Sequence, residues 1–115
     1  MGEEILYHKD IGFPKLPMRP TLVTLKYGSH ARQEALEDRY GNIKLPKQVL
    51  LERSNLIELG MIGGTVTKVV MRQKYSKTHD LIIVISTKDN FVRTVWLNCV
   101  EDLHSTLDRS KYAVP

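Results

Sequence analysis

The segment after the last apolar run of the chain carries side chains that can transfer protons. In DLHSTLDRSKY, residues 102–112, His104 and Asp108 stand four residues apart, so a short C-terminal helix would place them on one face. A carboxylate beside a histidine orients the ring and raises its affinity for a proton, which suits a general acid. Tyr112 adds a second proton donor. The alternative is an ordinary surface pair. Acidic residues outnumber basic ones by three to two over residues 101–111, and this negative charge is unusual for a catalytic edge that acts on a polyanion.

Basic side chains gather in the middle of the chain. Residues 68–77 hold four basic residues and no acidic one, in a chain of 17 basic and 13 acidic residues with a net charge of +4. Lys68, Arg72 and Lys74 share a face if this segment is a strand, because side chains alternate between the two faces of a sheet. Lys74 and Arg93 are the leading phosphate contacts, since cations on adjoining strands can clamp one phosphate. The alternative is a merely polar outer sheet face.

Two further candidates stand at the expected start of a helix. Ser29 can act as the N-cap, and the positive end of the helix dipole lowers the affinity of His30 for a proton. A neutral His30 could act as a base, could cap the helix, or could pack on the preceding strand. The residues that we nominate for nucleic-acid contact are His30, Arg32, Lys68, Arg72, Lys74 and Arg93. The residues that we nominate for catalysis are Arg93, His104 and Tyr112.

The absence of several short motifs argues against other kinds of chemistry. The chain has no glycine-rich phosphate loop, no HExxH and no CxxC, and the glycines of GMIGG precede a strand where a phosphate cradle should open a helix. The single cysteine, Cys99, can form neither an internal disulfide nor a zinc knuckle. We therefore predict no metal and no cofactor.

The length and the composition of the chain fit one ordinary globular domain. A chain of 115 residues with 42% hydrophobic and 26% charged residues has room for one core. No run approaches the roughly 18 apolar residues of a spanning helix, and MGEEILYHKD is acidic where a secretory signal would be basic. We expect a cytoplasmic protein with no membrane partner.

The elements that must position these residues follow from hydrophobic periodicity. Residues 21–27 alternate as a strand, an apolar stripe predicts a helix from Ser29 to Gly41, and Pro46 suits the first position of a second helix over residues 46–55. Four strand patterns with short connections follow, over residues 56–59, 65–75, 80–86 and 91–98. The predicted fold class is α+β, with two N-terminal helices packed on a twisted, mainly antiparallel sheet of four to five strands and a short C-terminal helix.

Residues 1–20 form a proline-containing N-terminal arm in this prediction, ahead of a single α+β domain over residues 21–115. Prolines at three-residue spacing in FPKLPMRP hold the backbone extended and forbid a helix. The arm either lies against the domain or offers a PxxP ligand to an aromatic groove.

The element order and a few short words of sequence resemble the RelE/BrnT-like superfamily of small toxins and its uncharacterised, often phage-encoded relatives. The likeness covers residues 21–98 and rests on Ser29-His30-Ala31-Arg32, on the strands TVTKVVM and DLIIVIS, and on RTVWLN. It implies an RNase-like fold whose sheet presents basic residues, a histidine or an acid, and a terminal tyrosine to RNA. It also implies cleavage without a metal. A base activates the ribose 2′-hydroxyl, cations stabilise charge on phosphorus, and an acid protonates the leaving oxygen.

Two functions follow as expectations. The first is a toxin-like, metal-independent ribonuclease or an RNA-binding descendant of that fold. The second is a non-catalytic, phage-encoded small protein that binds and inhibits a host protein. The expected partner is therefore RNA, or a host or antitoxin protein. A homodimer that pairs exposed sheet edges is a third arrangement.

Overall fold

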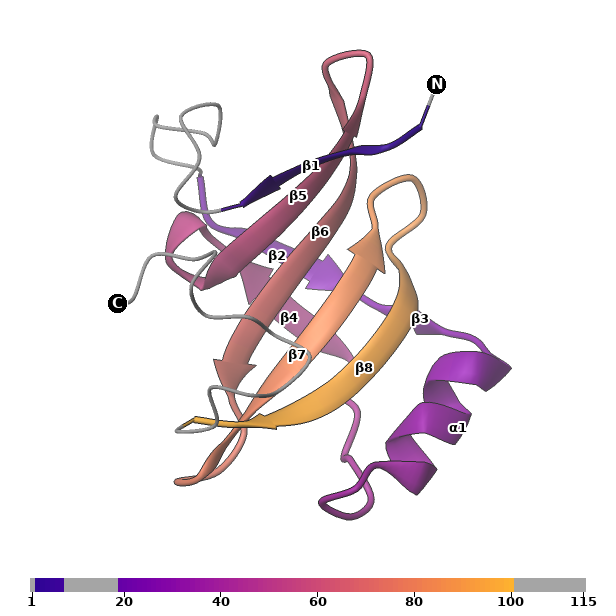
Figure 1. The fold of residues 1–115 in the computed structure, drawn as a ribbon, viewed down its shortest axis with the longest axis vertical. Helices are drawn as coiled ribbons and strands as arrows, with labels where there is room; N and C mark the ends of the chain where they lie inside the picture. The colour runs from indigo at the N-terminus through magenta and orange to yellow at the C-terminus, as the bar shows by residue number, and fades with distance from the viewer. Residues whose placement is uncertain (1, 8–18, 101–115) are drawn as a thin grey trace.

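The fold is built mainly from strands. The computed structural model describes residues 2–7 and 19–100, and in them six strands form one sheet while two others pair behind it (Figure 1). The order across the sheet is β1 (Glu4–Tyr7), β5 (Leu56–Ile62), β6 (Thr65–Lys74), β7 (His79–Ser86), β8 (Phe91–Cys99) and β3 (Lys26–Tyr27). Neighbouring strands are antiparallel except β3, which runs parallel to β8, so the sheet is mixed.

Strands β5 to β8 form a meander of tight hairpins. Gly63 and Gly64 close the first turn with φ of 56° and 82°, and Asn90 lies in the last turn with φ of 58°. Glycine and asparagine enter this left-handed region at the lowest cost, which fixes where these two hairpins reverse. Residues 81–85 of β7 are buried at every position, as the unbroken apolar run predicts for a central strand.

The main core lies between the sheet and a second layer behind it. That layer holds β2 (Thr21–Thr24) paired with β4 (Gln48–Leu51), while the helix α1 (Ser29–Glu37) lies beside β8 (Figure 1). The buried side chains of the second layer and the sheet form one apolar cluster, which includes Val23, Ala31, Ala35, Val49, Leu59, Met71, Ile83 and Val95. We call the opposite side of the sheet, turned away from this core, the outer face.

The predicted second helix over residues 46–55 is wrong. Its middle is strand β4, which is followed by a 3₁₀ turn over Arg53–Asn55. In β4 the side chains alternate, with Val49 buried opposite Val23 of β2 while Leu50 is exposed. This cross-strand packing outweighs the weak helix preference of the segment.

The predicted fold class is also wrong. The described residues contain one α-helix where two were expected, and a mixed sheet of six strands where four to five mainly antiparallel strands were expected. The sixth place is filled from the predicted arm, because β1 pairs with β5. The proline run and the expected C-terminal helix lie outside the described residues.

The first helix is confirmed, with different ends. Gly28 is its N-cap where Ser29 was expected, and the helix stops at Glu37, four residues before Gly41. A Cβ at Gly28 would lie 2.5 Å from the Phe91 ring, so close packing requires glycine there. Within residues 2–7 and 19–100, no helix is both long and apolar enough to cross a membrane.

Tyr27→Phe is expected to lower the free energy of unfolding by about 1 kcal/mol, because the Pro46 carbonyl loses the hydroxyl that donates to it. Burial raises the pKa of Tyr27 to about 12, against the opposing charge of Arg32. Because the unfolded side chain titrates near about 10, this stabilisation is complete below that pH and is lost as the pH rises through the folded pKa. Urea unfolding at pH 8 and pH 11 should show the advantage of the wild type shrinking at the higher pH. A constant difference would contradict the assignment.

Candidate nucleic-acid interface

The three basic residues of β6 that we nominated lie on one face of the sheet. Arg93 and Lys74, however, are too far apart to clamp one phosphate. Lys68, Arg72 and Lys74 lie on the outer face, paired in register with Ser86, Ile82 and Asp80 of β7. Arg93 lies near the start of β8, at the Ser86 end of the sheet, and β7 separates the two strands. Six residues of strand span roughly 20 Å. Lys74 and Arg93 are therefore at opposite ends of the sheet, and one phosphate cannot contact both.

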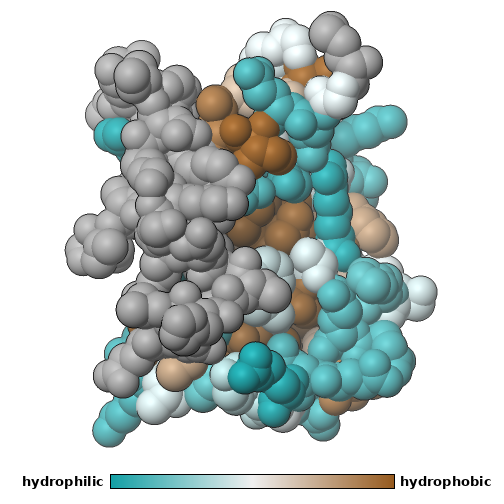
Figure 2. Space-filling view, viewed as in Figure 1, coloured by the Kyte–Doolittle hydropathy of each residue, from teal (hydrophilic) through white to brown (hydrophobic). Residues whose placement is uncertain are grey.

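Arg72 is committed to an ion pair across the β6–β7 hairpin. Its guanidinium donates to the Asp80 carboxylate, and the two side chains are only 18% and 14% exposed. Beside the pair, the outer face is apolar, with Ile57, Val70, Ile82 and Val84 buried and Trp96 packed against them. Figure 2 shows apolar side chains between hydrophilic ones on this face. Trp96 thus belongs to a packed cluster, and Arg72 is held in place beside it.

Lys68 and Arg93 face carboxylates at the other end of the sheet. The Lys68 ammonium lies 3.2 Å from Glu58 and 3.8 Å from Glu3, and the Arg93 guanidinium lies 3.3 Å from Glu3. Glu3 is far from both cations in sequence, whereas Glu58 lies ten residues before Lys68 on the paired strand β5. The excess positive charge of residues 68–77 is therefore offset at this end.

His30 and Arg32 lie at the start of α1, away from the cations of β6. His30 Nε2 is 3.5 Å from the Glu34 carboxylate, and Arg32 is exposed. Glu34 in turn accepts from the Thr94 hydroxyl at 2.6 Å and from the Val95 N–H at 3.3 Å, on the edge of β8. Carboxylates of α1 thus cover a strand edge that would otherwise offer free N–H groups.

Aromatic and basic side chains gather where β6 turns into β7. We call this group the aromatic–basic end: Arg39, Tyr40, Lys44, Lys74, Tyr75, Lys77 and His79. The Tyr40 ring lies against the His79 ring with centroids 4.2 Å apart, and the Arg39 guanidinium lies 4.8 Å from the Tyr40 centroid. The Tyr75 hydroxyl accepts from the Lys44 N–H at 2.9 Å. Two rings are therefore fixed by the protein while Tyr40 stays 39% and Tyr75 37% exposed.

His79 is held more firmly than its place in a turn suggests. Its Nδ1 is 2.8 Å from the Thr78 hydroxyl, and its carbonyl accepts from Tyr75 N and Ser76 N. Its Nε2 is buried and has no hydrogen-bond partner among the described residues. The ring is thus oriented by Thr78 and Tyr40, with one nitrogen unused.

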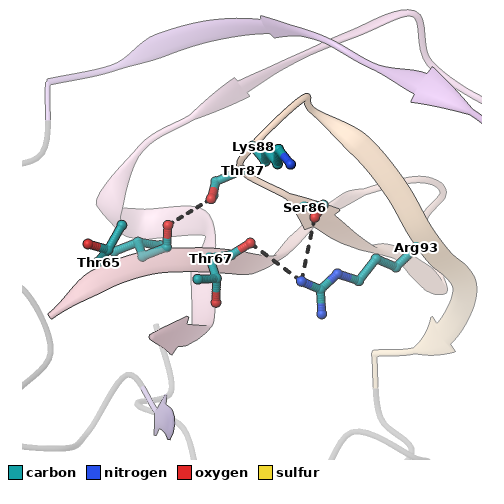
Figure 3. Close-up of a pocket in the computed structure, with 7 residues that line it drawn as sticks. Thr65, Thr67, Ser86, Thr87, Lys88 and Arg93 are labelled. Carbon is teal, nitrogen blue, oxygen red and sulfur yellow. Dashed lines mark hydrogen bonds between the residues drawn. The ribbon is translucent and has the colours of Figure 1, made fainter. Parts of the chain in front are cut away.

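A pocket lies at the opposite end of the sheet. It has a volume of about 600 Å³ and is lined by Thr65, Val66, Thr67, Ser86, Thr87, Lys88 and Arg93. Figure 3 shows the Arg93 side chain reaching across toward Thr67 and Ser86, and the guanidinium donates to the Thr67 carbonyl and the Ser86 hydroxyl, both at 3.5 Å. Hydroxyl groups and two cations thus line an open cavity.

Comparison with models of known families finds no match for this chain, and neither curated proteins nor solved structures show a match.

The nominated residues His104 and Tyr112 lie outside the described residues. The described chain ends at Val100, whose N–H donates to the Thr78 carbonyl at 2.9 Å. Val100 therefore lies beside Thr78, at the aromatic–basic end. Arg93 lies seven residues earlier on the same extended strand, at the far end of the sheet.

Sequence reasoning missed the meeting of Tyr40 with His79. Tyr40 follows α1 and His79 begins β7, so their contact depends on how the helix packs beside the sheet. The local signal was limited to Lys74, Tyr75 and Lys77, which place basic and aromatic residues on either side of one turn.

Proposed function

We propose that the aromatic–basic end binds single-stranded RNA and that the chain cleaves RNA there as a toxin-like, metal-independent ribonuclease. The observation that carries the proposal is a pair of partly exposed rings, Tyr40 and Tyr75, fixed by the protein, with the Arg39 guanidinium against Tyr40 and lysines close to both rings in the chain. Bases of single-stranded RNA stack on such rings, and cations beside them contact the phosphates.

The fixed rings favour binding because the two tyrosine side chains are already ordered before RNA binds. Tyr40 already contacts Arg39 and His79, and the Tyr75 hydroxyl accepts a hydrogen bond from the Lys44 backbone. A ring that is ordered in advance loses less conformational freedom on binding, so more of the stacking energy contributes to affinity.

Cleavage would draw on the segment that follows Val100. A base removes the proton of the ribose 2′-hydroxyl, O2′ attacks phosphorus, and an acid gives a proton to the departing 5′-oxygen, which leaves a 2′,3′-cyclic phosphate. His104 and Tyr112 supply the acid–base groups in this proposal, and lysines at the aromatic–basic end stabilise charge on phosphorus. The cytoplasm, where RNA is abundant, is the proposed location.

Binding is tested by fluorescence anisotropy with a labelled single-stranded RNA. Tyr40→Ala should weaken binding about tenfold, as expected when one base loses the ring on which it stacks. Replacing both Lys74 and Lys77 by alanine should make the slope of log K against log salt shallower by about 1.4, or about 0.7 for each phosphate that no longer meets a lysine. Lys26→Ala, which removes an exposed lysine at the other end of the sheet and outside the pocket there, is the matched control. Equal weakening in all three variants, or no RNA binding by the wild type, would contradict the proposal.

Cleavage is tested on the same RNA. His104→Ala and Tyr112→Phe should abolish the cyclic-phosphate product while RNA affinity stays within about twofold of the wild type. Cleavage that survives both changes removes residues 101–115 from the mechanism.

A second candidate, inhibition of a host protein, is favoured by one observation. Leu22 of β2 and Leu50 of β4 face each other in register and are 63% and 44% exposed. A pair of exposed apolar side chains on a two-stranded ribbon suits a protein partner. The test is capture of a host protein. Capture by the wild type and by Tyr40→Ala, together with loss of capture by Leu22→Ser, would support inhibition of a host protein over RNA binding.

A further inference from the structure

The side chain of Glu3 reaches across the outer face of the sheet. From its position just before β1, its carboxylate passes over β5 and accepts from the Thr67 hydroxyl of β6. Both terminal nitrogens of Arg93, on β8, donate to it at 3.3 and 3.4 Å, and the Lys68 ammonium lies 3.8 Å away. One carboxylate is thus held by a hydroxyl, a guanidinium fork and an ammonium, which come from two other strands.

Gly60 of β5 keeps the path of this side chain open. A Cβ at position 60 would lie 2.7 Å from Glu3 Cδ, closer than real Cβ contacts come. Gly60 pairs in register with Ile5 on one side and Lys68 on the other, directly under the path to Arg93. A larger residue there would push the Glu3 carboxylate away from its partners, and the cost to the sheet would be small because the end of a flexible side chain is all that must move.

The groups around Glu3 are those that hold a phosphoryl group. Arginine binds phosphate oxygens through two parallel N–H donors, lysine adds a point charge, and hydroxyls complete the set. The Ser86 hydroxyl accepts from the same guanidinium at 3.5 Å and can turn to donate to an anion instead. Beside these groups lies the open pocket of about 600 Å³, which leaves room for the rest of a ligand.

Hydrogen bonds and charges hold the Glu3 carboxylate in place, but the adjoining strand β1 is only weakly attached to the sheet. The hydrogen bond from Thr67 lowers the pKa of Glu3 most, the charges of Arg93 and Lys68 add to this, and burial opposes it. Strand β1 has four residues and, among the described strands, pairs with β5 alone, at one edge of the sheet. Short edge strands open at the lowest free-energy cost, so Glu3 can leave while Arg93 and Lys68 stay in place.

We infer that Thr67, Lys68, Ser86 and Arg93 form a phosphate-binding site in which Glu3 is the built-in occupant. A ligand that carries a phosphoryl group binds there by taking the place of the carboxylate. The site is separate from the aromatic–basic end and lies at the opposite end of the sheet. A small phosphorylated molecule and the terminal phosphate of an oligonucleotide both supply this chemistry.

The test is calorimetric titration of the full chain with inorganic phosphate and pyrophosphate. Glu3→Gln and Gly60→Ala both vacate the site by different means, and each should tighten binding roughly three- to tenfold, because a competing charge is removed. Glu4→Gln removes the neighbouring, exposed carboxylate at the first position of β1 and should leave affinity unchanged. Arg93→Ala should weaken binding at least about tenfold.

Two outcomes would overturn the inference. The first is equal affinity in the wild type, Glu3→Gln and Gly60→Ala, with thermal unfolding showing that all three are folded. The second is wild-type affinity in Arg93→Ala. Tyr40→Ala should bind phosphate normally, so a failure of the RNA proposal would leave this result intact. Titration with an oligonucleotide that carries a 5′-phosphate, against the same oligonucleotide with a 5′-hydroxyl, distinguishes the two sources of the phosphoryl group.

Discussion

Ile83→Ala is expected to lower the free energy of unfolding by about 2 to 5 kcal/mol, the largest effect of any single truncation that we predict. Ile83 is fully buried in β7, the strand between β6 and β8, and it faces Met71 and Val95 in register. Both neighbours belong to strands that are fixed on two sides, so the structure cannot collapse into the space left by three missing carbon atoms. The cost therefore combines the loss of apolar burial with the cavity that remains.

Urea unfolding followed by the fluorescence of the single tryptophan, Trp96, measures this effect. Leu50→Ala is the matched control, because Leu50 also lies in a strand but is 44% exposed, and its truncation should change the free energy by no more than about 0.5 kcal/mol. The slope of free energy against urea should stay the same in both variants if only stability has changed. A loss below about 1 kcal/mol in Ile83→Ala would show that β7 is not the centre of the core.

The four-strand meander could be predicted from the sequence because its signals are local. Residues 56–59, 65–75, 80–86 and 91–98 were expected as strands, and the structure has Leu56–Ile62, Thr65–Lys74, His79–Ser86 and Phe91–Cys99. Each strand has a strong apolar pattern, and its turn residues lie between it and the next strand. The information needed to place each strand is therefore contained within about ten residues of it.

Strands β1 and β4 depend on contacts that the sequence does not display. Strand β1 has four residues and exists because β5 offers it an open edge. Strand β4 lies in a segment that fits a helical pattern equally well, and its pairing with β2 stabilises the strand over the helix. Short segments take the conformation that their tertiary neighbours favour, so periodicity alone could not assign them.

The candidate site shows the same division. The shared face of Lys68, Arg72 and Lys74 followed from strand periodicity alone. Their partners did not, because Glu3 and Glu58 reach Lys68 from two other parts of the chain. Charge counted along a segment therefore overstated the positive charge that this face offers to a ligand.

Asp80→Ala is the second large effect, with an expected loss of about 2 to 4 kcal/mol of unfolding free energy. Removing the carboxylate leaves the Arg72 guanidinium, whose side chain is 18% exposed, without its closest anion beside an apolar cluster. A partly buried charge is costly to leave unpaired, and its residual contact with water keeps the cost below that of a fully buried pair. Urea unfolding at pH 7 measures the loss. Thr24→Ala, at an exposed strand position on the β2–β4 ribbon, serves as the control.

A double-mutant cycle then separates the structural role of Arg72 from the RNA contact for which the sequence nominated it. If the pair acts as a unit, the variant with both Arg72→Ala and Asp80→Ala should lose at least about 1 kcal/mol less than the two single losses added together. RNA affinity of Arg72→Ala, measured where the variant is still folded, should then equal that of the wild type. Additive losses combined with weaker RNA binding would instead place Arg72 on the RNA, and the interface would have to extend from the turn along the outer face of β6.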